Sequence, residues 1–191
     1  MIYLIFQLGL YLLIAAILGG IIGYQYGRRR SSETQEENVD FATELMRAGD
    51  EDFVVLEGRD IQEVEGIGAG YSRRLKALGI KDLAGLLRKG LTEKGVKEMS
   101  GAVRIDGAIV QKWVAMTDLL RVPGMNGQFA ELLQASGIGS VQQLAKENPS
   151  RLAKTIVQVN QKERRMPEAD MPERQVVRQW IDNARPLKHV L

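Results

Sequence analysis

The chain has 191 residues, with 26 Lys and Arg against 24 Asp and Glu, and it contains no cysteine. The lack of cysteine excludes a disulfide framework, thiol chemistry and thiolate metal ligands. The single histidine, His189, lies two residues from the C-terminus, which argues against a histidine-based metal site or catalytic triad.

The N-terminal segment has the composition of a membrane span. Residues 1–27 carry no charged side chain, and Arg28, Arg29 and Arg30 follow them. About 20 helical residues at about 1.5 Å each cross a hydrocarbon core of about 30 Å. Because the arginines follow the apolar run, we expect a single-pass transmembrane helix in an inner or plasma membrane, with the rest of the chain in the cytoplasm. The alternative is a buried core helix.

Small residues recur at every fourth position of this segment: Ala15, Gly19, Gly23 and Gly27. Such a row lets a second helix approach closely, which indicates self-association or docking on another membrane protein. The alternative is that glycine is simply common in membrane helices.

Residues 28–60 consist of the three arginines that follow the apolar segment and an acidic tether. From residue 31 to residue 60, ten side chains are acidic and two are basic. We interpret this part as a solubilising linker, although its charge could also hold the domain off an anionic leaflet. We expect residues 53–56 to be an extended segment packed on the domain.

Residues 61–80 contain a turn flanked by two helices. Glycines at positions 66 and 68 allow a tight turn, a helix begins near Ala69, and Gly79 closes it. The pattern recurs 58 residues later. The matching pairs are Gly66 and Gly124, Tyr71 and Phe129, Leu75 and Leu133, Gly79 and Gly137, and Ile80 and Ile138.

A second pair of matching segments, around Trp113 and Trp180, is 67 residues apart. The nine extra residues indicate an insertion in the second copy, which we place at residues 166–173. We interpret both tryptophans as core anchors. The fold class is therefore all-α, with one repeat over residues 61–120 and a second, degenerate repeat over residues 121–191.

Capping residues predict three further helices. Asp106 suits the start of a helix over residues 107–120, and Ser150 that of a helix over residues 151–159. Pro172 suits the start of a last helix, which we expect to end at Ala184.

The pattern from Val64 to Ile80 resembles the helix-hairpin-helix motif of DNA polymerases, ligases and repair nucleases. Residues 61–187 as a whole look like an uncharacterised, mainly bacterial family of tandem helix-hairpin-helix domains. The stretches around Trp113 to Gly124 and Gln175 to Ile181 carry this resemblance. The family has no settled activity, so the resemblance implies a fold more than a function.

In proteins with this motif, the turn and the second helix present backbone N–H groups to a phosphate. Exposed amides and a positive helix end bind anions in any fold. The candidate phosphate-binding residues here are Gly66, Gly68, Gly70, Arg73, Arg74 and Lys76. The second copy departs from this pattern, since Asn126 replaces the second glycine and Glu131 brings a negative charge.

A catalytic role finds no support, because the sequence shows no nucleophile–base pair, no metal-ligand spacing and no cofactor motif. We interpret the protein as a non-catalytic interaction module or accessory subunit of a membrane complex. The alternative is a membrane-tethered protein that binds DNA through the first hairpin without sequence preference. A further basic cluster, Lys162, Arg164 and Arg165, would strengthen that alternative if it joined Arg73 and Arg74.

Overall fold

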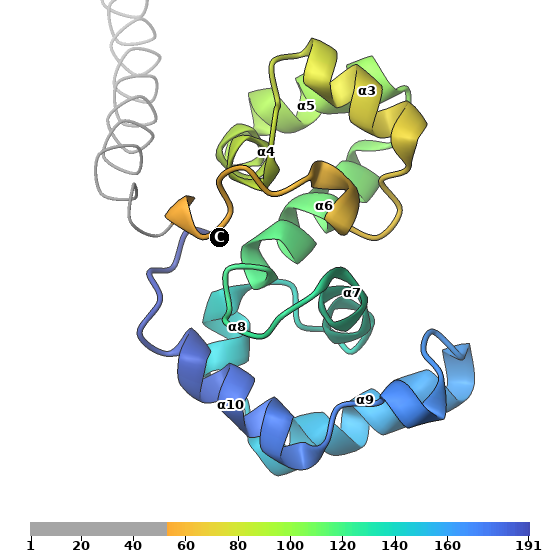
Figure 1. Cartoon of the computed structure of the whole chain (residues 1–191), viewed down its shortest axis with the longest axis vertical. Helices are drawn as coiled ribbons and strands as arrows, with labels where there is room; N and C mark the ends of the chain where they lie inside the picture. Colours follow the sequence, from red (N-terminus) through yellow and green to blue (C-terminus); the bar gives the residue numbers. More distant parts are fainter. Residues whose placement is uncertain (1–52) are drawn as a thin grey trace, which may run out of the picture. The chain divides into compact units, whose positions relative to one another are not determined.

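The computed structural model describes residues 53–191 (Figure 1). The transmembrane helix expected over residues 1–27, its row of small residues, Arg28 to Arg30 and the tether up to residue 52 lie outside the described residues. From residue 53 onward, no helix combines the length and the apolar character that a membrane crossing requires.

The all-α prediction is confirmed for the described part of the chain, which contains eight α-helices, two short 3-10 helices and no strand. In chain order the elements are η1 (Ile61–Glu63), α3 (Ala69–Ala77), α4 (Leu83–Gly90), α5 (Glu93–Val103), α6 (Gly107–Leu119), α7 (Gly127–Ala135), α8 (Val141–Ala145), α9 (Pro149–Glu163), η2 (Glu168–Asp170) and α10 (Arg174–Ala184).

Side chains that cap the first amides explain where several helices begin. The prediction for Asp106 is confirmed, since its Oδ1 accepts from the Ala108 amide at 2.7 Å. The prediction for Ser150 is wrong, because the Asn148 side chain caps α9 and Pro149 opens it. Proline suits the first helical position, where its missing N–H is not needed. The last helix begins at Arg174, two residues later than predicted.

Positions 58 residues apart have the same local geometry in both halves of the domain. Gly66 and Gly124 adopt φ of +88° and +82°, values in the left-handed region that favours glycine. Gly79 and Gly137 do so at +85° and +89°. After each of them, the next amide bonds back five residues: the Ile80 amide to the Leu75 carbonyl at 3.1 Å, and the Ile138 amide to the Leu133 carbonyl at 3.0 Å.

Each half is closed by a buried tryptophan that packs on the aromatic residue in the first turn of α3 or of α7. The rings of Tyr71 and Trp113 have their centroids 5.4 Å apart, and those of Phe129 and Trp180 are 4.9 Å apart. Both tryptophans belong to the hydrophobic core, as predicted. Helix α6 links the halves, because it packs on α4 and α5 and also on α7 (Figure 1).

The nine extra residues of the second copy are not confined to residues 166–173. Helix α9 has 15 residues where α5 has 11, and the connection after α9 is also longer than the one after α5. Asn160 closes this connection, since its side chain exchanges two hydrogen bonds of 2.9 Å with the Met166 backbone.

The expectation of an extended segment at residues 53–56 is wrong. Phe53 and Val54 are helical, residues 55–58 form a turn, and the Leu56 amide donates to the Phe53 carbonyl at 2.9 Å. This segment buries Phe53 and Leu56 on one side and leaves Val54 and Val55 exposed. One helical turn therefore places the two apolar residues that reach the core on the same side.

Candidate nucleic-acid interface

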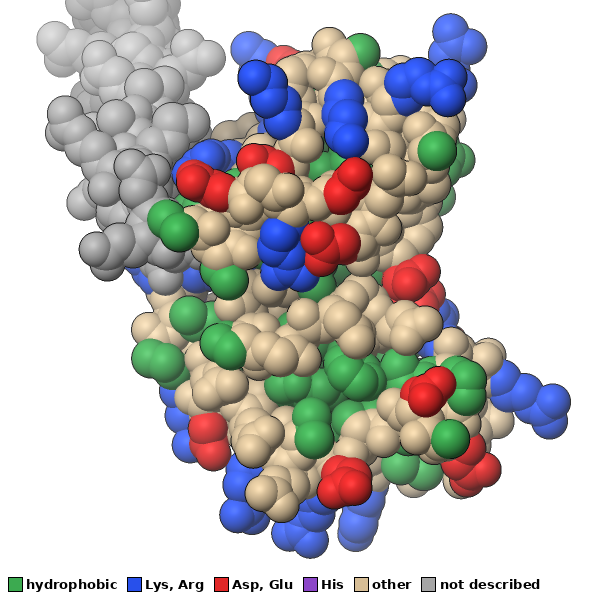
Figure 2. Space-filling model, in the orientation of Figure 1, with side chains coloured by type: hydrophobic (Ala, Val, Ile, Leu, Met, Phe, Trp, Pro, Cys, Tyr) green, Lys and Arg blue, Asp and Glu red, His purple; other side chains and the backbone are tan. Residues whose placement is uncertain are grey.

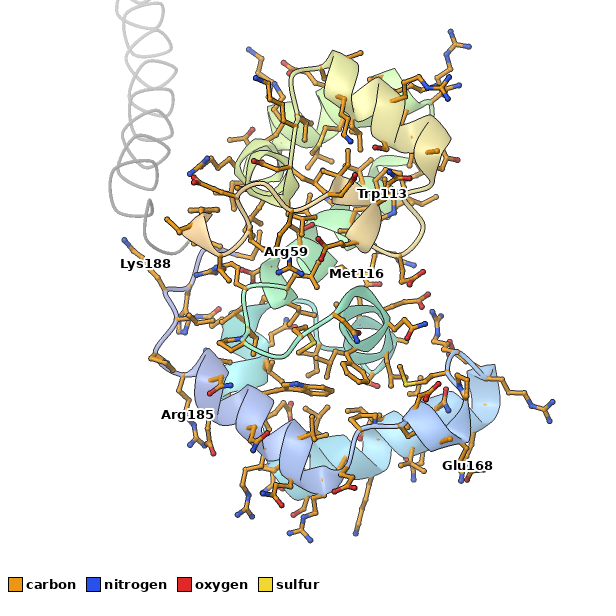
Figure 3. All side chains as sticks on the ribbon, in the orientation of Figure 1. Arg59, Trp113, Met116, Glu168, Arg185 and Lys188 are labelled. Carbon is orange, nitrogen blue, oxygen red and sulfur yellow. The ribbon has the colours of Figure 1, made fainter. Side chains whose placement is uncertain are left out.

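The first hairpin, which we define as residues 61–77, consists of η1, a turn and α3. The turn closes through a hydrogen bond from the Ile67 amide to the Val64 carbonyl at 3.0 Å. Gly66 is required here for two reasons. Its φ is +88°, and a Cβ at this position would come within 3.1 Å of Nε1 of Trp113. Figure 3 shows Trp113 beside the loop that joins η1 to α3.

The start of α3 is an open helix end. Gly68 is the N-cap, has no side chain to cap the helix, and lies in an extended conformation. Within residues 53–191, the amides of Ala69, Gly70 and Tyr71 have no acceptor. A Cβ added at Gly68 or Gly70 would meet no atom within 4 Å. The amides are thus both unbonded and accessible, as an anion-binding helix start requires.

The three predicted cations of α3 differ in their contacts. Arg73 is exposed and has no partner within residues 53–191. Arg74 donates from Nη1 to the Val103 carbonyl at 3.0 Å, so it also stabilises the end of α5. Lys76 lies 3.4 Å from Oδ2 of Asp60. The Gln62 amide, followed by Lys76, lowers the pKa of Asp60. Only Arg73 is therefore fully available to a phosphate.

Sequence reasoning missed two further cations. Lys97 and Arg104 are exposed and unpaired within the described residues, and they stand seven positions apart along α5 and its C-cap. That spacing puts them on the same face of a helix. Because Arg74 contacts Val103, the end of α5 adjoins α3. Figure 2 shows Lys and Arg side chains gathered over this end of the domain. Arg104 adopts φ of +58°, which no sequence signal indicates for an arginine.

The second hairpin, residues 119–135, has its corresponding helix start closed. Oδ1 of Asn126 accepts from the Phe129 amide at 2.8 Å. Gly127 packs against η1 so tightly that a Cβ there would lie 2.0 Å from the Glu63 carbonyl oxygen. Glu131 occupies the position that matches Arg73 and binds Arg165 at 2.6 Å. This hairpin therefore offers no free, electropositive helix start.

The cluster of Lys162, Arg164 and Arg165 does not join Arg73 and Arg74. Arg165 is bound to Glu131 of α7 and to Glu163, both at 2.6 Å. Figure 1 shows the end of α9 well apart from α3. Beside this cluster lies an open hollow of about 540 Å³, whose apolar lining comes from Val157, Met166, Pro167 and Met171. The basic surface beside the first hairpin therefore comprises Arg73 and Arg74 of α3, Lys97 of α5 and its C-cap Arg104.

Within residues 53–191, no group of three His, Asp or Glu side chains could hold a metal ion. No curated protein and no solved structure matches the chain. A family model described as "Domain of unknown function (DUF4332)" matches residues 65–187, which is more than half of the chain and covers the turn and α3 of the first hairpin and all of the second. The chain belongs to this family of domains of unknown function.

Proposed function

We propose that the protein is a non-catalytic, membrane-anchored binding protein, and that its first hairpin contacts the phosphate backbone of nucleic acid without reading the base sequence. The proposal includes a transmembrane helix over residues 1–27, a cytoplasmic domain, and helix-hairpin-helix identity for the two repeats. The observation that carries it is the difference between the two helix starts, of which that of α3 is open and that of α7 is closed.

Charge supports the same distinction. Helix α3 carries Arg73, Arg74 and Lys76 and no acidic residue. Helix α7 carries Glu131 and no basic residue. Arg74 and Glu131 also have structural contacts, but Arg73 has no partner within residues 53–191, so stabilising the fold does not account for it. A phosphate approaching α3 meets amide donors first and cations one turn later, which is the order that backbone binding needs.

The binding we propose is weak. One hairpin with Arg73 and the neighbouring Lys97 and Arg104 neutralises only a few phosphates. Affinity for duplex DNA grows with the number of phosphates neutralised and falls steeply with salt. Attachment to a membrane would compensate for weak binding by raising the local concentration of the domain near membrane-bound nucleic acid.

A salt titration tests this proposal. The full-length chain in detergent micelles should bind a short DNA duplex at low salt, and the affinity should fall linearly with salt on a log–log plot. Arg73→Glu should abolish measurable binding. Arg178→Glu is the matched control, since Arg178 is an exposed arginine of α10 that also lacks a partner within residues 53–191. Equal losses in both variants would show that net charge, not the hairpin, attracts the DNA.

A second candidate is an accessory subunit of a membrane complex, and the apolar hollow at the end of α9 favours it. Val157 is 45% exposed there, beside the Met166 and Met171 that line the same hollow. Methionine-lined surfaces adapt to different apolar partners. Purification of the full-length chain in a gentle detergent should then recover a stoichiometric membrane protein. Gly19→Leu with Gly23→Leu should weaken the recovery if the membrane helix makes the contact.

A further inference from the structure

The indole N–H of Trp113 is an unused hydrogen-bond donor at the turn of the first hairpin. Trp113 is 3% exposed, and no acceptor for its Nε1 lies within residues 53–191. No fully enclosed side-chain nitrogen or oxygen in that part of the chain lacks a partner. The Nε1 atom therefore reaches the surface, although almost all of the rest of the side chain is buried.

The position of this N–H relates it to the open amides. Nε1 lies 3.1 Å from the place where a Cβ of Gly66 would stand, two residues before the N-cap of α3. The indole ring packs on Tyr71, whose amide is one of the three without an acceptor. The indole thus lies against Gly66 of the turn and against the Tyr71 ring in the first turn of α3. Because its ring is held by the core, the N–H direction is fixed before any ligand arrives.

We propose that the Trp113 indole donates a hydrogen bond to a phosphate group held at residues 66–71, beside the open amides of α3. This inference rests on the proposed nucleic-acid function and names a residue that acts in it. An indole is a donor only, so it fits a phosphate oxygen and cannot bind a cation. It adds a neutral contact to a site whose other side-chain contacts are charged.

Acidic side chains near the turn do not close the site. Glu65 precedes Gly66, but its Cγ lies 3.8 Å from the place where a Cβ of Gly127 would stand. Its side chain is therefore directed toward the second hairpin. Glu63 binds Arg59 at 2.6 Å. Both carboxylates still lower the local potential and oppose an anion, so several donors are needed to hold one phosphate here.

The second copy supplies an internal control. Trp180 is 2% exposed, also lacks an acceptor within the described residues, and lies 3.8 Å from the place of a Gly124 Cβ. Its neighbouring helix start is capped by Asn126 and pressed against Glu63. With the Phe129 amide capped and Gly127 pressed against the Glu63 carbonyl, the helix start beside Trp180 leaves less room and fewer donors for a phosphate, so this indole should not hold one. The two tryptophans are the only ones in the chain, so each can be followed separately.

The test uses the full-length chain in detergent micelles, labelled with ¹⁵N-tryptophan and titrated with a short DNA duplex at low salt. We expect the indole resonance of Trp113 to shift and that of Trp180 to stay. Trp113→Phe keeps an aromatic ring and removes the N–H, and it should weaken affinity about tenfold, as loss of a hydrogen bond to a charged group does. The slope of affinity against salt should not change, because the indole is neutral. Trp180→Phe should bind as the wild type does.

The outcomes separate this inference from the proposed function. If the duplex binds while the Trp113 resonance stays still, the inference is overturned and the function stands. Unchanged affinity in a folded Trp113→Phe variant has the same meaning. If the unaltered chain binds no duplex at low salt, both the proposed nucleic-acid function and this inference are wrong. Should Trp113→Phe not fold, the resonances of the unaltered chain decide the question alone.

Discussion

Asp118 and Arg121 form an ion pair inside the core, with Oδ1 and Nη1 2.7 Å apart and side chains that are at most 1% exposed. The other carboxylate oxygen accepts from the Val141 amide at 2.7 Å, so Asp118 also fixes the start of α8. Nη2 of Arg121 donates to the Lys188 carbonyl at 2.8 Å, and its guanidinium faces the Phe53 ring. This ion pair therefore links Phe53 and Lys188, near the two ends of the described chain, to the segment between α6 and α7.

Breaking this pair should be costly. Arg121→Met removes the charge but leaves the Asp118 carboxylate buried and partly unpaired, and we expect a loss of about 3–5 kcal/mol in the free energy of unfolding. The matched control is Arg185→Met, because Arg185 forms an ion pair with Asp182 that is more than half exposed. That change should cost less than about 1 kcal/mol. Denaturant unfolding followed by tryptophan fluorescence measures both, and similar losses would contradict the structural role of the buried pair.

The same carboxylate predicts a pH dependence of stability. Burial raises the pKa of Asp118 above its ordinary value, despite the Val141 amide and Arg121, which act in the opposite direction. The folded state then binds a proton more tightly than the unfolded state, so this contribution is fully present below the unfolded pKa and is lost as pH rises through the folded pKa.

Asp118→Asn isolates this contribution, because it retains Asp60 and Glu98, whose pKa values are lowered and whose effect has the opposite sign. We expect the stability advantage of the wild type over Asp118→Asn to shrink as pH rises from the unfolded pKa through the folded pKa. Denaturant unfolding at a series of pH values measures it. An advantage that grows with pH would mean that Arg121 lowers the pKa of Asp118 by more than burial raises it.

Two glycine substitutions should act in opposite directions. Gly127→Ala places a methyl group 2.0 Å from the Glu63 carbonyl oxygen, so η1 and α7 must separate, at a cost of about 1–3 kcal/mol. Gly101→Ala lies in the exposed part of α5, where a Cβ meets nothing within 4 Å. It should stabilise the domain by about 0.5–1 kcal/mol. Thermal unfolding distinguishes them, and a neutral Gly127→Ala would mean that the two hairpins are not tightly packed.

Several elements follow from local sequence because their signals are local. The glycines at 79 and 137 end their helices as predicted, since only glycine adopts that backbone conformation without strain. The start of α3 at Ala69 follows from the turn before it. The start of α9 was misplaced because Ser150 and Asn148 are both good caps, and Pro149 between them decides in favour of Asn148.

The composition of the candidate site could be predicted only in part, because tertiary contacts decide which groups stay free. Nothing in the sequence of α3 shows that Arg74 reaches the Val103 carbonyl or that Arg104 lies nearby. The sequence shows that Asn126 departs from the glycine pattern of the first hairpin. It does not show that the Glu63 carbonyl lies against the same helix start. The Trp113 N–H was assigned to the core, and only its position beside Gly66 shows that it reaches the turn.

Gly68→Asn should separate stability from binding. Gly68 has φ of −78° and ψ of 174°, an extended conformation that suits an asparagine cap, and its Cβ would stand in open space. By analogy with Asn126, whose Oδ1 accepts from the Phe129 amide, the new side chain should accept from the Tyr71 amide. The domain should gain a few tenths of a kcal/mol.

Nucleic-acid affinity should fall severalfold in the same variant, because the asparagine oxygen occupies a donor that a phosphate would use. The reciprocal change, Asn126→Gly, frees the Phe129 amide but leaves the Glu63 carbonyl against Gly127. It should slightly destabilise the domain and leave affinity and salt slope as they are. Duplex titration and thermal unfolding of both variants measure the two effects. A Gly68→Asn variant that is stabilised yet binds as the wild type does would place the phosphate contact elsewhere, since the cap cannot form without using the amide.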